Sequence, residues 1–205
     1  DGSTWDRLSP VKVATLTDVA QISGGGAHTC ALVSAGAVAC WGPNASGQLG
    51  DGSYNDSLIP RSVVGLANVA QVEAGFGHTC ALAEGQVRCW GSNAYGQLGD
   101  GGATMVRNTP SAAIAGLTNV VQLAAGTYHT CALRGTGDVA CWGYNPNGQL
   151  GDGTGVNRST PAAVSTLSGV ALVTLGAVST CALSADGLVR CWGNNLYGQV
   201  GDGTS

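Results

Sequence analysis

The sequence predicts an all-β protein made of β-propeller blades. One motif recurs four times with a period of about 50 residues. Short apolar and β-branched segments bounded by glycine are typical of strands. Glycine makes up 34 of the 205 residues, against a usual share of about 7%, and Gly or Pro interrupts every candidate helix. These observations favour many short strands joined by tight turns.

Each repeat contains the same succession of segments. An apolar stretch that begins at a proline leads to V-A-Q-V-x-A-G, H-T-C-A-L, a short turn, V-x-C-W-G and x-N-x-x-G-Q-L-G-D-G. We divide the chain into one domain of four tandem repeats, at residues 1–50, 51–99, 100–151 and 152–201, with 202–205 starting a further repeat. In the second repeat the expected strands are Val69–Ala74, Thr79–Ala83 and Gln86–Trp90.

These strands are apolar on both faces, so both faces should be buried. Radially arranged four-stranded blades bury both faces against their neighbours, and a period of 40 to 50 residues suits them. A parallel β-helix is the main alternative, but its rungs are usually shorter and it does not contain antiparallel hairpins. Three arrangements fit four repeats: part of a seven-bladed ring, a four-bladed ring closed by its own ends, or subunits that continue head to tail.

The spacing of the cysteines predicts a hairpin register. If Cys80 lies opposite Cys89, then Glu84-Gly85 is a two-residue turn with glycine second, which suits a type I′ turn. If Cys30 lies opposite Cys40, then Ser34-Ala35-Gly36 is a three-residue loop with glycine in its left-handed last position. One register therefore explains both spacings. Opposed residues come close enough for a disulfide after a modest local adjustment.

Zinc binding and redox chemistry are the two alternative roles for the cysteines. His28, Cys30 and Cys40 could offer three zinc ligands, but Ser179 replaces the histidine in the fourth repeat and no fourth ligand is evident. Redox pairs usually have two residues between their thiols at the start of a helix. We therefore expect no metal and four structural disulfides, formed by Cys30, Cys40, Cys80, Cys89, Cys131, Cys141, Cys181 and Cys191.

Composition argues against several functions. Charged residues are only 10% of the chain, the net charge is -4, and no run of Lys or Arg occurs, so we expect no nucleic-acid partner. Apolar runs such as Val170–Leu175 are far shorter than a membrane span, so we expect no membrane insertion. Paired cysteines favour an oxidising compartment, which predicts a secreted or cell-surface protein. Because no nucleophile elbow, phosphate loop or carboxylate pair is present, we expect neither an enzyme nor a cofactor.

The repeated motifs, such as Cys40-Trp41-Gly42-Pro43-Asn44 followed by Gly47-Gln48-Leu49-Gly50-Asp51-Gly52, resemble the regulator-of-chromosome-condensation repeat family. The chain is similar to the cysteine-bearing variant common among secreted bacterial proteins. The resemblance implies a propeller, typically of seven blades, with roles that include nucleotide exchange on a small GTPase, chromatin association, light sensing and inhibition of β-lactamases. The basic tail that the chromatin role requires is absent. So are the Trp and Arg before the repeat His that the light sensor requires.

Residues shared by all repeats are interpreted as scaffold. The Trp of each C-W-G could be a stacking platform, but we expect it to pack between blades. The Asp of each G-D-G could bind calcium, but the spacing does not fit an EF-hand, so we expect a turn hydrogen bond. The histidines, which could be general bases, are expected to be buried and hydrogen-bonded.

Function is therefore expected where the repeats differ, because binding loops need not repeat. The most variable segments are Ser53–Ile59, Gly102–Thr109 and Thr154–Thr160. Candidate contact residues are Tyr54, Met105, Arg107, Tyr144, Arg158 and Tyr197. The sequence predicts a non-catalytic propeller scaffold that binds a protein or self-associates through exposed blade ends. A carbohydrate-binding propeller and a guanine-nucleotide exchange factor are the alternatives.

Overall fold

The computed structural model describes residues 1–204. Those residues form fifteen β-strands in four antiparallel sheets. The strands are β1 (Val19–Gly24), β2 (Thr29–Val33), β3 (Val38–Gly42), β4 (Ser57–Ser62), β5 (Val69–Ala74), β6 (His78–Ala83), β7 (Gln86–Ser92), β8 (Val106–Arg107), β9 (Val120–Ala125), β10 (His129–Arg134), β11 (Val139–Gly143), β12 (Arg158–Ala163), β13 (Val170–Leu175), β14 (Ser179–Ser184) and β15 (Val189–Gly193). No helix that could cross a membrane occurs within residues 1–204.

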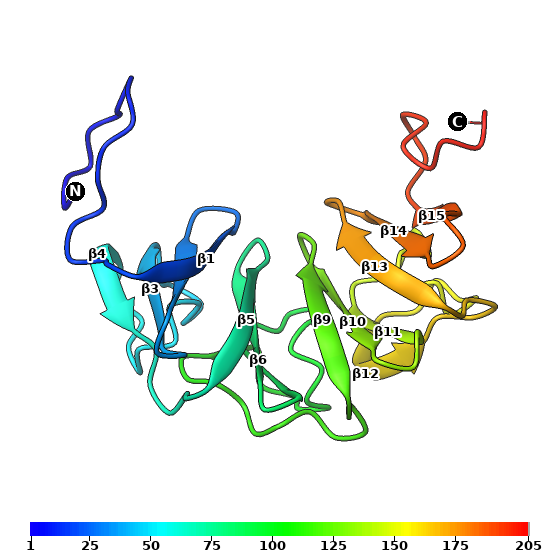
Figure 1. Cartoon of the computed structure of the whole chain (residues 1–205), viewed down its shortest axis with the longest axis horizontal. Coiled ribbons are helices and arrows are strands. Elements are labelled where there is room, and N and C mark those ends of the chain that lie inside the picture. The colour runs from blue at the N-terminus through cyan, green and yellow to red at the C-terminus, as the bar shows by residue number, and fades with distance from the viewer. Residues whose placement is uncertain (205) are drawn as a thin grey trace.

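Each sheet is one blade, and its strands follow one another in chain order. Blades 1, 2 and 3 have four strands each, β1–β4, β5–β8 and β9–β12, and blade 4 has β13–β15. The first strands of successive blades contact one another, so β1, β5, β9 and β13 form the inner wall. The blades follow one another along an open arc, with the chain ends at its two extremes (Figure 1). The all-β propeller is confirmed, whereas a four-bladed ring closed by its own ends is not formed.

The hairpin register expected from the cysteines is confirmed. Cys80 pairs with Cys89 in the β6–β7 ladder, and the pairing continues to Ala83 opposite Gln86. Both turn residues have the left-handed backbone that a type I′ turn requires, with φ 55° at Glu84 and φ 73° at Gly85. In blade 1 the three-residue loop ends at Gly36, whose φ is 74°. The residue missing from the second repeat therefore changes only the turn.

Four disulfides join the cysteines of the same hairpin. The Cα atoms of each pair are 4.1 Å apart, and the sequence separation is 9 or 10 residues. The pairs are Cys30–Cys40, Cys80–Cys89, Cys131–Cys141 and Cys181–Cys191. Every blade therefore carries one covalent link between its second and third strands.

The outer strand of each complete blade comes from the variable segment that follows it in the sequence. β4 and β12 include part of what we expected to be loops, and each contains a proline, Pro60 or Pro161. Proline has no amide proton to donate, so within sheets it is tolerated at edges. A blade is thus offset from the sequence repeats: its inner strand starts at Val19, Val69, Val120 or Val170.

The hydrophobic core is divided among the junctions between blades. Between blades 1 and 2, Leu32, Leu49 and Val72 pack with Trp90, which is fully buried. Trp142 occupies the equivalent place between blades 2 and 3, and Trp192 packs against the cluster between blades 3 and 4. These three tryptophans thus pack at junctions rather than offering a surface for stacking, whereas Trp41 of blade 1 is half-buried and belongs to none of the three junction clusters. Burial of both faces, as expected from the apolar strands, is greatest in the blades with two neighbours, which contain the fully buried strands β6 and β11.

Candidate binding face

The repeated histidines join adjacent blades. Nε2 of His28 lies 2.8 Å from the hydroxyl of Thr79 in the next blade, and that hydroxyl donates to the carbonyl of Gln48 at 2.9 Å. The threonine proton is therefore in use, so His28 donates from Nε2. The indole of Trp90 donates to the same Gln48 carbonyl at 2.9 Å. Equivalent contacts start from His78 and His129 at the next two junctions.

Burial keeps these imidazoles neutral. It lowers the pKa of His28 and of His129 to about 4. For His78, burial first and then the two neighbouring histidines lower the pKa to about 3. A second proton would have to sit on Nδ1, which has no hydrogen-bond partner among residues 1–204 in any of the three. The geometry fits a structural contact rather than a general base or a metal ligand.

A glutamine on the inner strand makes a second link between blades. The Gln21 side chain donates to the carbonyl of Val72 and accepts from its amide, both at 3.0 Å. Gln71 and Gln122 link the next two junctions in the same way. Blade 4 has Leu172 in place of this glutamine and Ser179 in place of the histidine. Its outward face therefore lacks both residues that hold one blade to the next.

The repeated aspartates stabilise turns, as expected. Asp51, Asp100 and Asp152 each accept a hydrogen bond from the backbone amide two residues later. Two of them also bind arginines that we proposed as contact residues: Arg107 lies 3.0 Å from Asp100, and Arg158 lies 2.7 Å from Asp152. Burial alone would raise the pKa of Asp152. Hydrogen bonds from Arg158, Thr154 and Asn145 outweigh that effect and lower the pKa to about 2. Both arginines belong to outer strands, β8 and β12.

One face of the arc gathers the segments that differ between repeats. The turns after β1, β5, β9 and β13 lie at the same strand ends as the loops that follow β3, β7, β11 and β15. We call this surface the loop face. The hairpin turns between the second and third strand of each blade lie on the opposite face.

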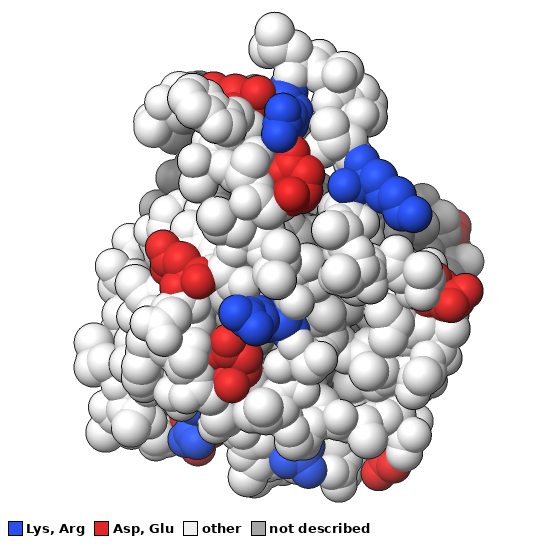
Figure 2. Space-filling view, turned by 90° about the vertical axis from the view of Figure 1, so that its left-hand side faces the viewer, with Lys and Arg blue, Asp and Glu red and all other residues white. Residues whose placement is uncertain are grey.

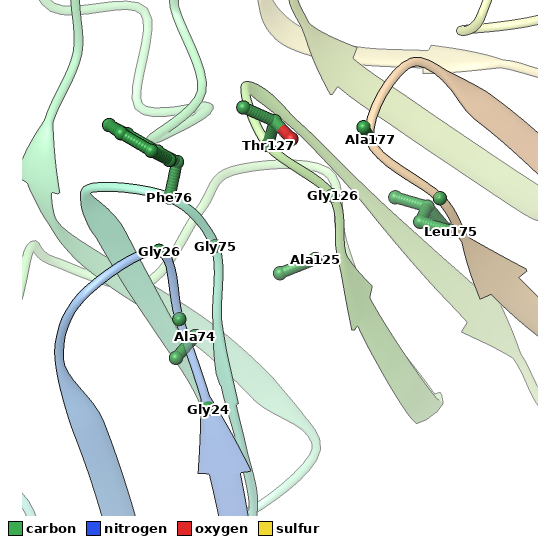
Figure 3. A pocket seen from close by; sticks show the side chains of 12 residues that line it. Gly24, Gly26, Ala74, Gly75, Phe76, Ala125, Gly126, Thr127, Leu175 and Ala177 are labelled. Carbon is green, nitrogen blue, oxygen red and sulfur yellow. The ribbon is translucent and has the colours of Figure 1, made fainter.

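A shallow depression of about 310 Å³ lies on the loop face beside the inner wall. Figure 3 shows the four turns next to one another, with the Phe76 ring projecting above its own turn. The turns are joined by backbone hydrogen bonds, such as Phe76 N to Thr127 O at 3.2 Å. The depression is lined by Gly24–Gly26, Ala74–Phe76, Ala125–Thr127 and Leu175–Ala177. None of these side chains titrates, so the depression offers shape and backbone groups but no charge.

Next to the depression, four aromatic side chains converge where blades 2 and 3 meet. We call Phe76, Tyr95, Tyr128 and Tyr144 the aromatic cluster. Tyr95 is 5.2 Å from Tyr128 and 4.8 Å from Tyr144, measured between ring centroids, and Phe76 is 5.7 Å from Tyr128. The rings meet at steep angles, the edge-to-face arrangement that aromatic pairs prefer. Phe76 is 54% exposed and Tyr95 37% exposed, so the cluster faces solvent.

The backbone holds the cluster in place. The amide of Tyr144 donates to the carbonyl of Tyr128 at 2.9 Å, and the amide of Tyr95 donates to Oε1 of Gln97 at 2.8 Å. The loop that bears Tyr95 also packs closely on outer strand β12, since Gly96 approaches Ser159 with no room for a side chain. The rings are therefore mounted on constrained turns.

The other repeats show that the fold does not need these rings. In the first repeat the equivalent positions hold Gly26, Ala27, Pro43 and Ser46. Blade 1 has the same four strands although none of these four positions is aromatic. Of the one Phe and five Tyr in the chain, four meet in this one place. The cluster is thus an addition to the scaffold, which is what a binding surface would be.

Sequence reasoning found one member of the cluster, Tyr144, and missed the other three. Phe76, Tyr95 and Tyr128 are not among the candidates that the sequence predicts. Comparing the repeats position by position would have flagged all four as aromatic at a place where small residues suffice. The remaining candidates stay predictions: Tyr54, Met105 and Tyr197 are exposed on the loop face, but none belongs to the cluster.

Charged side chains of both signs are mixed on the side of the molecule that Figure 2 presents. Figure 2 shows acidic and basic side chains interspersed among a large majority of uncharged ones, with no patch of one sign on the face that it presents.

The fold matches solved structures over most of the chain. Human WBSCR16 is 28% identical, with a match that covers 91% of this chain and 50% of that chain at a TM-score of 0.81. Prp20p from Saccharomyces cerevisiae, a protein with binding properties to Gsp1p and histones, is 26% identical over 96% of this chain and 50% of its own, at a TM-score of 0.84. Yeast RCC1 (Prp20), in its complex with Kap60, is 26% identical. That match covers 91% of this chain and 46% of that chain at a TM-score of 0.81. The chain spans about half the length of these proteins.

Two sequence models of one family match all four repeats. Both describe the regulator of chromosome condensation (RCC1) repeat. One matches residues 19–48, 69–97, 120–149 and 170–199, and the other matches residues 35–82, 84–133 and 136–183. The first model begins at the inner strand of every blade, so it follows the structural unit. Sequence, disulfide-bearing hairpins and propeller geometry agree, and the chain belongs to the RCC1 repeat family.

Proposed function

We propose that this protein is a non-catalytic propeller scaffold, secreted or on the cell surface, that binds a partner protein through the aromatic cluster. The observation that carries the proposal is the convergence of four aromatic side chains at positions where the scaffold accepts small residues. Tyrosine is enriched at protein interfaces because it supplies a large rigid contact area at low entropic cost.

Three further observations support this proposal. The titratable groups that could act as bases, the three histidines, are buried and bonded to threonines. Four disulfides are typical of proteins that mature in an oxidising compartment. Prp20p, a relative with the same fold, has binding properties to the proteins Gsp1p and histones. Protein binding therefore has a precedent in this family.

Site-specific photo-crosslinking would test the proposal. A photoreactive phenylalanine analogue at position 95 lies in the cluster, whereas the same analogue at Thr136 lies in an exposed hairpin turn of blade 3 on the opposite face. We expect position 95 to form a discrete adduct with one protein from the native surroundings of this chain, and position 136 to form none. Equal labelling at both positions, or no adduct at either, would contradict binding through the cluster.

A further inference from the structure

We propose that the aromatic cluster binds an extended, proline-rich segment of its partner. This inference rests on the proposed function and narrows it from a protein partner to one backbone conformation, polyproline II. Segments of that kind are recognised by aromatic-lined surfaces, because their stiff backbone loses little entropy on binding.

The geometry of the rings limits what they can hold. Rings with centroids 4.8 to 6.1 Å apart at steep angles are in contact with one another, so nothing fits between them. A cage around a methylated ammonium group would need rings set apart around a space. A ligand must instead lie across the cluster, and it meets rings from two adjacent blades in turn. An extended peptide has the shape for such a contact.

The phenol groups supply matching hydrogen-bond donors. None of the hydroxyls of Tyr95, Tyr128 and Tyr144 bonds to another group within residues 1–204. A polyproline II segment makes no internal hydrogen bonds, so its carbonyls are free to accept. Proline itself has no amide proton and therefore requires no acceptor from the protein surface. The free phenol hydroxyls of the cluster can thus donate to the free carbonyls of the bound segment.

The charge of the site also fits a neutral segment. The depression beside the cluster is lined by Gly, Ala, Phe, Thr and Leu residues. The outer strands of blades 2 and 3 carry Arg107 and Arg158, but each is paired with the aspartate of the preceding loop, Asp100 or Asp152. Neither the uncharged depression nor these two ion pairs would select an acidic or basic peptide, whereas proline rings can pack on the exposed aromatic edges.

A carbohydrate would need side chains that bond its hydroxyls. The amides nearest the cluster are already engaged: Asn93 binds the Leu98 amide and the Thr104 carbonyl, and Asn145 binds the Leu150 amide and Asp152. Both asparagines are buried. Apart from the three phenol groups, only ring surfaces remain for a sugar, whose many hydroxyls need more partners than that, and this favours the peptide.

An array of immobilised dodecapeptides with a fixed Pro-x-x-Pro core would test this inference. The matched array has an Ala-x-x-Ala core and the same residues at all other positions. We expect the intact protein to be retained on the first array and not on the second. Retention should fall at least tenfold in Tyr95→Ala and in Tyr128→Ala, because each removes a central ring. Tyr95→Phe, which keeps the ring and removes one donor, should lose about three- to tenfold.

Leu188→Ala is the matched control. Leu188 lies in the hairpin turn of blade 4 on the opposite face and is 53% exposed, close to the exposed fraction of Phe76. Its replacement should leave retention unchanged. Equal retention on both arrays, retention on neither, or binding to a glycan array that Tyr95→Ala abolishes would each overturn the inference. A crosslink at position 95 to a partner without proline-rich segments would also overturn it while leaving the proposed function intact.

Discussion

Three imidazoles form the polar centre of the blade junctions, and each bonds to a threonine of the next blade. Their pKa values of about 3 to 4 lie well below the ordinary 6.5. The unfolded chain therefore takes up protons at a higher pH than the folded protein does. Stability from these groups is complete above about pH 6.5 and is lost as the pH falls toward the folded-state pKa.

We accordingly expect the free energy of unfolding to fall between pH 7 and pH 5, by about 2 kcal/mol for each buried histidine. His129→Ser, which copies the serine found at position 179, should lose about a third of that pH dependence. Denaturant unfolding at a series of pH values measures both. The comparison of the two proteins also cancels the opposite effect of Glu73, whose pKa is raised, chiefly by burial. An unchanged slope in the variant would contradict a buried neutral His129.

The glycine three residues before each histidine is required because the imidazole ring lies directly against it. A Cβ on Gly75 would overlap the ring of His78 and lie 2.7 Å from the carbonyl of Gly126 in the next blade. We expect Gly75→Ala to destabilise the protein by about 1 to 3 kcal/mol, as overpacking does. Gly24→Ala is the control, since nothing lies within 4 Å of its Cβ position. Chemical denaturation of both variants provides the test, and equal losses would refute the steric explanation.

At the scale of the element, the disulfide-bonded hairpin is the unit that repeats. Its turn chemistry and its cysteine pairing are local, because all the partners lie within about ten residues. A disulfide that closes a short loop gives the folded protein a moderate entropic stabilisation, which is nearly the same in every blade.

Removing the link from an interior blade should therefore cost more than the loop entropy. We expect Cys80→Ala with Cys89→Ala to lose about 2.5 to 3 kcal/mol from that entropy, plus the packing of two fully buried sulfurs. Cys181→Ala with Cys191→Ala opens a loop of nearly the same length in blade 4, where both residues are only partly buried. Thermal unfolding should rank the first pair as the more damaging. The reverse order would show that packing does not distinguish the blades.

At the scale of the whole molecule, the four blades are not equivalent. Every residue of β6 in blade 2 and of β11 in blade 3 is buried, whereas β15 in blade 4 has no buried residue. Blades 2 and 3 have a neighbour on both sides, while blades 1 and 4 each have one. In arrays of repeats, stability depends largely on contacts with nearest neighbours.

Amide hydrogen exchange should reveal this order. We expect the amides of β6 and β10 to exchange slowest and those of β14 and β15 to exchange much faster, although all four blades carry a disulfide. Peptide-resolved mass spectrometry measures the protection directly. Uniform protection across the four blades would contradict stabilisation by neighbouring blades.

Self-association through blade ends stays a prediction, and the outward face of blade 4 bears on it. A second copy docked head to tail would meet Leu172 and Ser179 where the earlier junctions have glutamine and histidine. Such a junction would lack both of the polar links seen between blades. Binding through the loop face does not depend on that contact.

The sequence by itself determined the repeat, the blade architecture, the hairpin register and the pairing of cysteines. These follow from the period and from turns such as Glu84-Gly85, whose partners are close along the chain. Tertiary structure alone decided that Phe76 and Tyr95 of blade 2 meet Tyr128 and Tyr144 of blade 3. It also decided which threonine each histidine binds, about 50 residues away. Such contacts depend on how far one blade is rotated from the next, and packing in the junction core sets that rotation.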